Sequence, residues 1–349
     1  KASVTDDRLP TGTWNEYSYS ILADGLPAAS FWDERRGPTG MAKNNFGQVM
    51  VTFPTVETPD KTIGMIAILP DQDGQHYDPD VITVQFNPYD DDYIFGLARL
   101  GNTIYGGGHD YWGYATLFEL ADDGSIVRRI RLSGLQQFDY LIGLVANPQN
   151  QRLYATTYSH HQVLEIDPAS GNYSDVTEPS SGLLDGITVS ADGNSVFVAD
   201  YTANYIRGFD IASGASILTV NVTPPQGGKV DGLAIGQGSL ANQLFVNCTK
   251  GEVMVVDLET EDYSTFSTAA ADSGRGDFIM VDDDGSLLLT QTHRILRLTP
   301  PTSGSFGVVN GMICTRDDQT TTYSPINLGT VTEAVSAEAG TFDLRGISG

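Results

Sequence analysis

Four of the five histidines in this chain lie in short loops that also carry polar or aromatic residues. Imidazole is well suited to proton transfer near neutral pH, and it can also bind a transition metal. His109 stands in the segment Gly-Gly-Gly-His-Asp-Tyr-Trp-Gly-Tyr (106–114), and it is our first candidate for contact with a ligand. His160 and His161 are adjacent, so an extended backbone would point them to opposite faces. His293 is the fourth member of the group.

Aspartates recur at similar intervals along the same part of the chain, at Asp139, Asp185, Asp231 and Asp277. Carboxylates that converge on one place cannot all stay charged without compensation. A hard cation such as Ca²⁺ would supply it, and so would hydrogen bonds from the amides of each aspartate's own turn. The spacing alone leaves both interpretations open.

These residues belong to a repeated unit. Its clearest copies begin at Asp185-Gly186 and Asp231-Gly232, and each later reaches a short apolar segment that ends in aspartate. If positions 40, 96, 143, 186, 232 and 278 are equivalent, the intervals are 56, 47, 43, 46 and 46 residues. A period of about 40–50 residues with four short strands is typical of a propeller blade. We therefore predict an all-β fold, a six-bladed β-propeller with four antiparallel strands in each blade.

The whole chain, residues 1–349, is predicted to form one propeller domain, with blades over about 37–300. The segment 14–22 alternates between polar and apolar residues, and we expect it to complete the last blade. Closing the ring with the N-terminal strand would leave no open sheet edge. Residues 315–349 are polar and are predicted to be a C-terminal extension.

Blade topology predicts which loops share a face. The loop that enters an innermost strand and the loop between the second and third strands lie at one end of the channel, which we call the top. These four histidines and the repeated aspartates fall there, over the channel mouth, where binding and catalytic residues commonly gather. The candidate catalytic residues are His109, His160, Arg36 and Tyr158. The candidate substrate-binding residues are Tyr111, Trp112, Tyr201, His161 and His293.

The composition narrows the choice of partners. With 19 Lys and Arg against 44 Asp and Glu, the net charge is −25, which would repel nucleic acids and anionic membranes. No segment approaches eighteen consecutive apolar residues, so none is predicted to span a membrane. The chain begins at Lys1 without an apolar leader, as a processed secretory chain or a trimmed one would. We expect a secreted monomer that acts on a small molecule.

Cysteines and sequons bear on the same expectation. Cys248 and Cys314 could form one disulfide in an oxidising compartment or could both be buried thiols. Three sequons place candidate glycosylation sites at Asn172, Asn221 and Asn247.

The repeat at 185–200 and its copy at 231–235 resemble the senescence-marker/gluconolactonase family of six-bladed propellers. They also resemble the wider group of NHL-repeat proteins, paraoxonases and virginiamycin B lyase. The resemblance covers residues 36–300 at the level of blades. It implies one divalent cation, usually calcium, at the top of the channel.

The resemblance implies four ligand positions for that cation. Three of them are aspartates in this chain, and the fourth differs from the family. Asp231 matches the family's aspartate, Asp185 stands where the family has asparagine, and Asp139 is a third candidate. Arg36 stands where the family has glutamate. Because a guanidinium cannot ligate a cation, this departure argues against the metal. Arg36 would instead neutralise the aspartates or bind a substrate carboxylate.

Three hypotheses for function follow. The first is a secreted enzyme that hydrolyses a lactone or an ester, in which a metal or Arg36 stabilises the oxyanion and His109 or His160 transfers a proton. The second is a metal-independent lyase or cyclase, including a catalyst of pericyclic cyclisation, which would use histidine, tyrosine and arginine side chains. The third is a propeller that binds glycans or proteins without catalysis.

Overall fold

The computed structural model describes residues 18–299, except 28, 32–33, 58–61, 73, 77–82, 86–91, 238–239 and 268–274, together with four strands between 306 and 337. The regular elements in these residues are β-strands, with no α-helix among them. The described part therefore contains no helix that is long and apolar enough to cross a membrane. The prediction of an all-β fold is confirmed.

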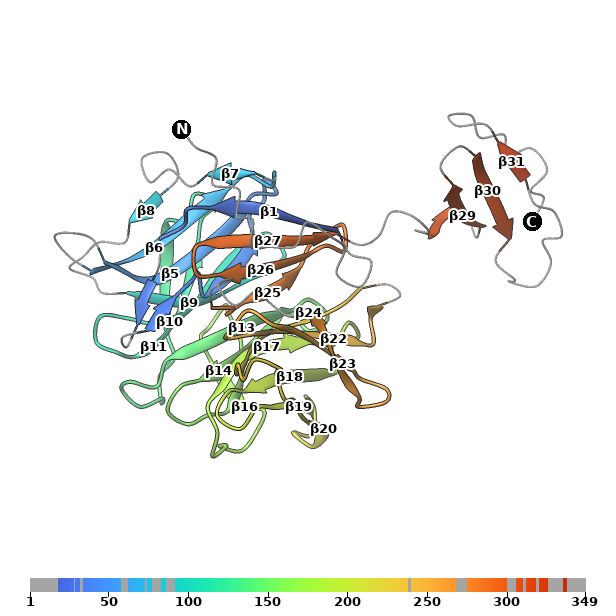
Figure 1. Cartoon of the computed structure of the whole chain (residues 1–349). Coiled ribbons are helices and arrows are strands. Elements are labelled where there is room, and N and C mark those ends of the chain that lie inside the picture. The colour runs from blue at the N-terminus through green and yellow to red at the C-terminus, as the bar shows by residue number, and fades with distance from the viewer. Residues whose placement is uncertain are drawn as a thin grey trace.

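Six four-stranded antiparallel blades account for most of the strands (Figure 1). Blade one contains β4 (Gly40–Lys43), β5 (Val49–Glu57), β6 (Thr62–Leu69) and β8 (Thr83–Gln85). Blade two contains β9 (Tyr93–Leu100), β10 (Thr103–His109), β11 (Ala115–Leu120) and β12 (Ile126–Arg131). Blade three contains β13 (Leu141–Asn147), β14 (Arg152–Thr157), β15 (Val163–Ile166) and β16 (Tyr173–Asp175).

The remaining blades follow the same order. Blade four contains β17 (Leu184–Val189), β18 (Ser195–Asp200), β19 (Tyr205–Asp210) and β20 (Ser216–Asn221). Blade five contains β21 (Val230–Ile235), β22 (Gln243–Cys248), β23 (Val253–Asp257) and β24 (Tyr263–Ser267). Blade six contains β25 (Ile279–Val281), β26 (Leu287–Gln291), β27 (Arg294–Thr299) and the N-terminal β1 (Ser18–Asp24).

The N-terminal strand closes the ring, as predicted. β1 lies antiparallel beside β27, with Ser18 opposite Thr299 and Ile21 opposite Leu296 (Figure 1). Just after β1, the Leu26 amide donates a 2.9 Å hydrogen bond to the His293 carbonyl. The His293 Nδ1 lies 3.0 Å from the Leu26 carbonyl oxygen. His293, predicted to bind substrate, thus holds the first and last parts of the ring together.

Strands outside the six blades extend two sheets and form another. β2 (Ala29–Phe31) and β3 (Glu34–Arg36) make a hairpin on the edge of β5, and β7 (Gln75–His76) pairs in parallel with β1. A separate antiparallel sheet contains β28 (Phe306–Val309), β29 (Met312–Asp317), β30 (Thr320–Pro325) and β31 (Val335–Ala337). It includes much of the region predicted as a C-terminal extension, and it begins before residue 315.

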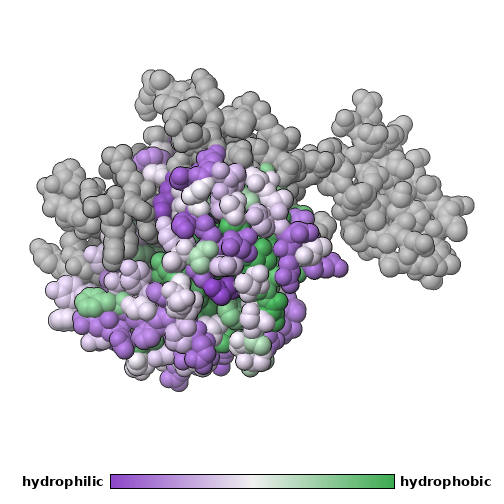
Figure 2. All heavy atoms as spheres, turned by 60° about the horizontal axis from the view of Figure 1, so that its bottom comes forward, coloured by the Kyte–Doolittle hydropathy of each residue, from purple (hydrophilic) through white to green (hydrophobic). Residues whose placement is uncertain are grey.

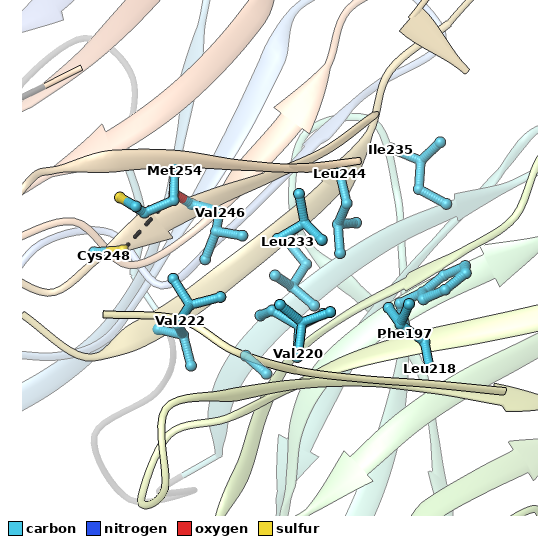
Figure 3. Close-up of a cluster of buried hydrophobic side chains, with 14 residues drawn as sticks. Phe197, Leu218, Val220, Val222, Leu233, Ile235, Leu244, Val246, Cys248 and Met254 are labelled. Atoms are coloured by element: carbon cyan, nitrogen blue, oxygen red, sulfur yellow. Dashed lines mark hydrogen bonds between the residues drawn. The ribbon is translucent and has the colours of Figure 1, made fainter. Parts of the chain in front are cut away.

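Apolar clusters fill the spaces between neighbouring blades. Figure 3 shows one of them, in which Phe197 and Val220 of blade four face Leu233, Val246 and other side chains of blade five. Strand geometry explains these clusters. Every second residue of a strand points to the same face, so the apolar residues of that face meet those of the neighbouring blade. Figure 2 shows the contrasting surface, where hydrophilic residues predominate on the face in view and hydrophobic ones form small groups.

The repeat positions that revealed the blades are sites of close approach between inner strands. A Cβ on any of five glycines would lie within 3.0 Å of a carbonyl oxygen in the inner strand of the next blade or just before it. These glycines are Gly40, Gly96, Gly143, Gly186 and Gly232. Only glycine lets adjacent main chains come this close, so the sequence signal has a steric cause.

Replacing Gly186 with alanine is therefore expected to force apart the inner strands of blades four and five, because its Cβ would meet the Asp231 carbonyl. The free energy of unfolding should fall by about 2–3 kcal/mol, the usual cost of overpacking. Urea denaturation measures it. Ser216→Ala, at an exposed position of the same blade, should change it by less than about 0.5 kcal/mol. Equal stability of the two variants would refute the steric explanation.

Candidate functional site at the top of the channel

A stack of four rings connects blades two and three at the top of the channel. Tyr93 begins β9, His109 ends β10, and Tyr140 and Tyr158 lie just before β13 and just after β14. The ring centroids are 4.6 Å apart for Tyr93 and His109, 4.4 Å for His109 and Tyr140, and 5.1 Å for Tyr140 and Tyr158. Burial, and next the neighbouring Tyr158, raises the pKa of Tyr140. His109 is thus packed between two tyrosines.

This packing changes the role expected of His109. Both faces of its ring have aromatic neighbours, and its Nδ1 lies 2.9 Å from the Asp110 carbonyl oxygen. The imidazole is therefore part of the aromatic wall of the mouth, and its contact with a ligand stays a prediction. The structure does bring His109 and Tyr158 together, as the topology predicted.

A histidine–aspartate pair lies at the start of blade three, next to the stack. Asp139 is fully buried, and its Oδ2 forms a very short contact with the Nδ1 of His160. Its Oδ1 accepts a 2.7 Å hydrogen bond from the Ser159 amide and a 3.3 Å bond from the His160 amide. A carboxylate bound to Nδ1 fixes the ring and places the proton there, so Nε2 is left as the basic nitrogen. The His160 side chain is one-third exposed, 33%, which leaves the ring open to solvent.

Three exposed aromatic side chains lie on the two loops beside this pair. Tyr111, Trp112 and Phe138 are 54, 60 and 57% exposed, and the rings of Tyr111 and Trp112 meet edge to face at 5.0 Å. The Phe138 amide donates a 2.7 Å hydrogen bond to the Gly113 carbonyl, which joins the loops. The Ser159 hydroxyl donates to the Phe138 carbonyl at 2.9 Å, which connects them to the His160 loop.

Asp110 organises the loop that carries Tyr111 and Trp112. Its Oδ1 accepts hydrogen bonds from the amides of Trp112 at 3.0 Å and Tyr114 at 3.1 Å. Its Oδ2 accepts a 2.8 Å bond from the Nε of Arg131, whose guanidinium also lies 4.6 Å from the centre of the Tyr114 ring. Phe138 has a φ of 69°, a left-handed conformation that costs a non-glycine residue energy. Exposed rings on loops held in this way form a preformed contact surface.

Arg275 compensates the aspartates on the other side of the mouth. Its Nη2 donates a 3.0 Å hydrogen bond to the Oδ2 of buried Asp231, and its Nε lies 3.8 Å from the Oδ2 of Asp277. Although burial acts to lower the pKa of Arg275, the carboxylates of Asp231 and Asp277 raise it above its usual value. The guanidinium also lies 5.8 Å from the centre of the Tyr201 ring.

The described residues do not fit a divalent cation. No group of three His, Cys, Asp or Glu side chains among them could hold a metal ion. Asp231 is paired with Arg275 and Asp139 with His160, while Asp185 lies half-buried at the start of β17. The carboxylates implied as ligands thus have protein partners, and we derive no chemistry from a metal.

The other predicted residues have clear positions. His161, with a left-handed φ of 52°, places its Nδ1 3.3 Å from the Ser180 carbonyl oxygen, and Tyr201 lies under Arg275. Arg36 ends β3, and its side chain lies outside the described residues. Asn172 and Asn221 are exposed.

Asn247 and Cys248 are structural. Asn247 is fully buried, and its amide nitrogen donates to the carbonyls of Phe278 at 2.9 Å and Thr290 at 3.1 Å. Asn247 therefore cannot carry a glycan in the folded chain, which corrects that prediction. Cys248 is a free, buried thiol whose pKa is raised by burial, so it forms no disulfide here.

Sequence reasoning missed Arg275 and the partners of His109 in the stack. Arg275 comes two residues before the recurring Asp277, in a loop that enters an inner strand. A search for a cation in the loops of the aspartates could have found it. The ring stack had no such signal, since it depends on side chains from two different blades.

Together these features define a six-bladed β-propeller whose top mouth carries a histidine–aspartate pair, a ring stack and an arginine held by two carboxylates. No protein-family model and no curated protein sequence matches the chain. Among solved structures it is similar to a streptogramin B lyase, with a TM-score of 0.56 and 14% identity, covering 82% of this chain and 99% of that one.

The chain is also similar to a structural genomics protein of unknown function from Bacteroides thetaiotaomicron VPI-5482. Here the TM-score is 0.58 with 11% identity, covering 80% of this chain and 75% of that one. At such identities the likeness establishes the fold alone. A streptogramin B lyase is thus among the structural neighbours, and these two neighbours do not confirm a likeness to the gluconolactonase family.

Proposed function

We propose that the chain is an enzyme that acts on a small organic molecule at the top mouth as a metal-independent lyase or cyclase. The observation that carries the proposal is His160, whose Nδ1 is fixed by the buried carboxylate of Asp139. A partly exposed imidazole oriented in this way is suited to act as a general base. The likeness to a lyase of the same fold supports this choice.

The reaction would begin with the removal of a proton. The Nε2 of His160 accepts a proton from a carbon next to an electron-withdrawing group of the substrate. The electron pair of that bond forms a new double bond, and the bond to the leaving group breaks. Asp139 stabilises the resulting imidazolium. His160 then gives its proton to the leaving group, which regenerates the neutral imidazole and completes the cycle.

Hydrolysis of a lactone or an ester is the weaker candidate. His160 could equally deprotonate water, but hydrolysis also needs a group that stabilises an oxyanion. Arg275 is already bound to Asp231 and lies beside Asp277, and Arg131 is bound to Asp110. The charges of both arginines are therefore offset before a substrate arrives. Lys229 and Lys250, in other top loops, donate to the main-chain carbonyls of Thr202 and Gln226.

The test is turnover in H₂¹⁸O. The protein is incubated with lactones, esters and cyclic compounds that carry an acidic carbon–hydrogen bond, and the products are weighed by mass spectrometry. A lyase or cyclase gives products whose masses sum to that of the substrate, without ¹⁸O. Incorporation of ¹⁸O would show a hydrolase. Ligand binding without turnover across the panel would favour a binding propeller.

We also propose, as the sequence analysis predicted, that this enzyme is secreted and acts as a monomer.

Trp112→Ala is expected to raise KM by about tenfold and to leave kcat within a factor of two or three. The indole is exposed beside the His160 loop and contributes contact area to the bound substrate, while it takes no part in proton transfer. Steady-state kinetics on a substrate from the panel measures the effect. Tyr263→Ala, which removes another exposed aromatic side chain, on the outer strand of blade five, is the control. A fall in kcat with unchanged KM would contradict this role.

A further inference from the structure

A cavity of about 540 Å³ occupies the opposite half of the channel from the His160 site. It is lined by residues in or near the C-terminal halves of the six inner strands β4, β9, β13, β17, β21 and β25. The residues of the proposed active site lie at the N-terminal ends of these strands or in the loops at that end. Since each strand runs from one end of the channel to the other, the cavity opens at the bottom.

Most of the residues that line this cavity are apolar, although polar groups contribute to its wall as well. Leu97, Leu144, Ile187 and Leu233 come from four successive blades, and Met280 comes from blade six. The first four are almost completely buried. Cavities of roughly 300–1,000 Å³ with mainly apolar walls and a few polar groups hold small organic molecules. The expected ligand therefore has an apolar body.

The rim carries one cation whose charge no carboxylate offsets directly. Arg99 is exposed, and its guanidinium donates to the Gly101 carbonyl at 2.9 Å and to the Asn45 side-chain oxygen at 3.0 Å. A third, longer bond of 3.5 Å reaches the Asn44 carbonyl. Among the described residues no carboxylate forms a salt bridge with Arg99. Neighbouring Asp122 instead accepts from the amide and side chain of Asn45.

The other charges of the rim form a network of their own. Lys43 bonds to Asp282 and, at 2.7 Å, to Asp71. Arg297 also bonds to these two aspartates. Asp283 lies 3.8 Å from the Lys43 Nζ and is exposed to solvent. The side of the rim formed by blades six and one thus carries more carboxylates than cations. Arg99, on blade two, is the part of the rim that presents a positive charge without a salt bridge among the described residues.

We propose that this cavity is a second ligand site that binds a small organic carboxylate. The apolar body would lie in the channel. The carboxylate would accept hydrogen bonds from those N–H groups of Arg99 that do not already donate to the oxygens of Gly101, Asn44 and Asn45. Guanidinium and carboxylate groups match well in geometry. The net charge of −25 opposes such a ligand only weakly at physiological salt, because charges more than about 8 Å apart are largely screened. The proposal does not depend on the proposed lyase activity.

The experiment compares 4-phenylbutyrate with 4-phenyl-1-butanol, which differ in charge and share an apolar body. Isothermal titration calorimetry at 0.15 M salt should show the carboxylate binding about tenfold or more tightly than the alcohol. Arg99→Gln should remove that preference, since a neutral amide cannot form a charge-assisted pair with the carboxylate. Arg128→Gln, on the outer strand of the same blade, should keep it.

A second set of measurements tests where the ligand binds, independently of the role of the Arg99 charge. Gln237 lines the cavity and is exposed, so Gln237→Trp should narrow the cavity without disturbing a packed core. That variant should lose binding while its circular dichroism and unfolding temperature stay near the wild type. In ¹³C-methyl spectra of the wild type, 4-phenylbutyrate should shift the signals of Met41 and Met280, which line the cavity.

Three results would overturn the proposal. They are equal affinity for the acid and the alcohol, unchanged acid binding in Arg99→Gln, and unshifted Met41 and Met280 signals. Failure of both probes to bind would also overturn it. None of these results bears on turnover at His160, so the two sites can fail independently.

Discussion

His160→Gln should lower kcat by about 10²–10⁴-fold, the usual contribution of general acid–base catalysis, and leave the unfolding temperature almost unchanged. Glutamine can still accept or donate hydrogen bonds near Asp139, but it cannot take a proton from the substrate. Because Asp139 also binds the amides of residues 159 and 160, the loop should keep its shape. The measurement is single-turnover kinetics on a substrate from the ¹⁸O panel, with circular dichroism as the check on folding.

The adjacent histidine provides a matched control. His161 is also half-buried at the top, but its Nδ1 faces the Ser180 carbonyl oxygen and no carboxylate. His161→Gln should therefore keep kcat within a few-fold of the wild type. Asp139→Asn should lower kcat strongly, since an amide cannot stabilise the imidazolium as a carboxylate does. Equal losses in the two histidine variants would show that the pair with Asp139 is irrelevant to catalysis.

Arg275→Leu should lower the free energy of unfolding by about 3–5 kcal/mol, because it leaves two carboxylates without the cation that offsets them. Asp231 and Asp277 are both buried, at 1 and 7% exposure, so solvent compensates them poorly. Urea denaturation at pH 7 measures the loss. The double variant Asp231→Asn with Arg275→Leu should recover part of it, since one of the two charges is then removed.

The same variant tests the interpretation of the metal site. A chelator should leave the unfolding temperature of the wild type unchanged, because Arg275 already compensates the aspartates. Calcium should stabilise Arg275→Leu more than the wild type, as the freed carboxylates become available to a hard cation. Destabilisation of the wild type by a chelator would contradict this assignment, and so would an Arg275→Leu variant as stable as the wild type.

The fold could be predicted because its determinants are local and repeated. Five of the six blades have an inner-strand glycine where the next blade's main chain approaches, so these glycines recur at blade intervals. The N-terminal strand could also be assigned, since its alternation matched an edge that the ring had to close. The end of the channel at which His109, His160 and Asp139 gather followed from strand direction alone.

The contacts within the site could not be predicted in this way. The sequence placed Asp139 with the other repeated aspartates, and only the three-dimensional structure pairs it with His160. His109 was a candidate for ligand contact, yet the rings of Tyr93 and Tyr140 pack against it. Such contacts depend on the rotamers of side chains from two blades. Asn247 shows the same limit, because its sequon cannot reveal that the side chain points into the core.

The most direct test of the proposed base is the tautomer of His160, which needs no substrate. Two-bond ¹⁵N–¹H spectra of protein labelled with ¹⁵N-histidine, assigned with His160→Gln, report which ring nitrogen carries the proton. We predict a protonated Nδ1 and a bare Nε2 in the neutral ring, and a changed pattern in Asp139→Asn. A proton on Nε2 in the neutral wild-type ring, or a spectrum unaffected by Asp139→Asn, would contradict a base held by Asp139.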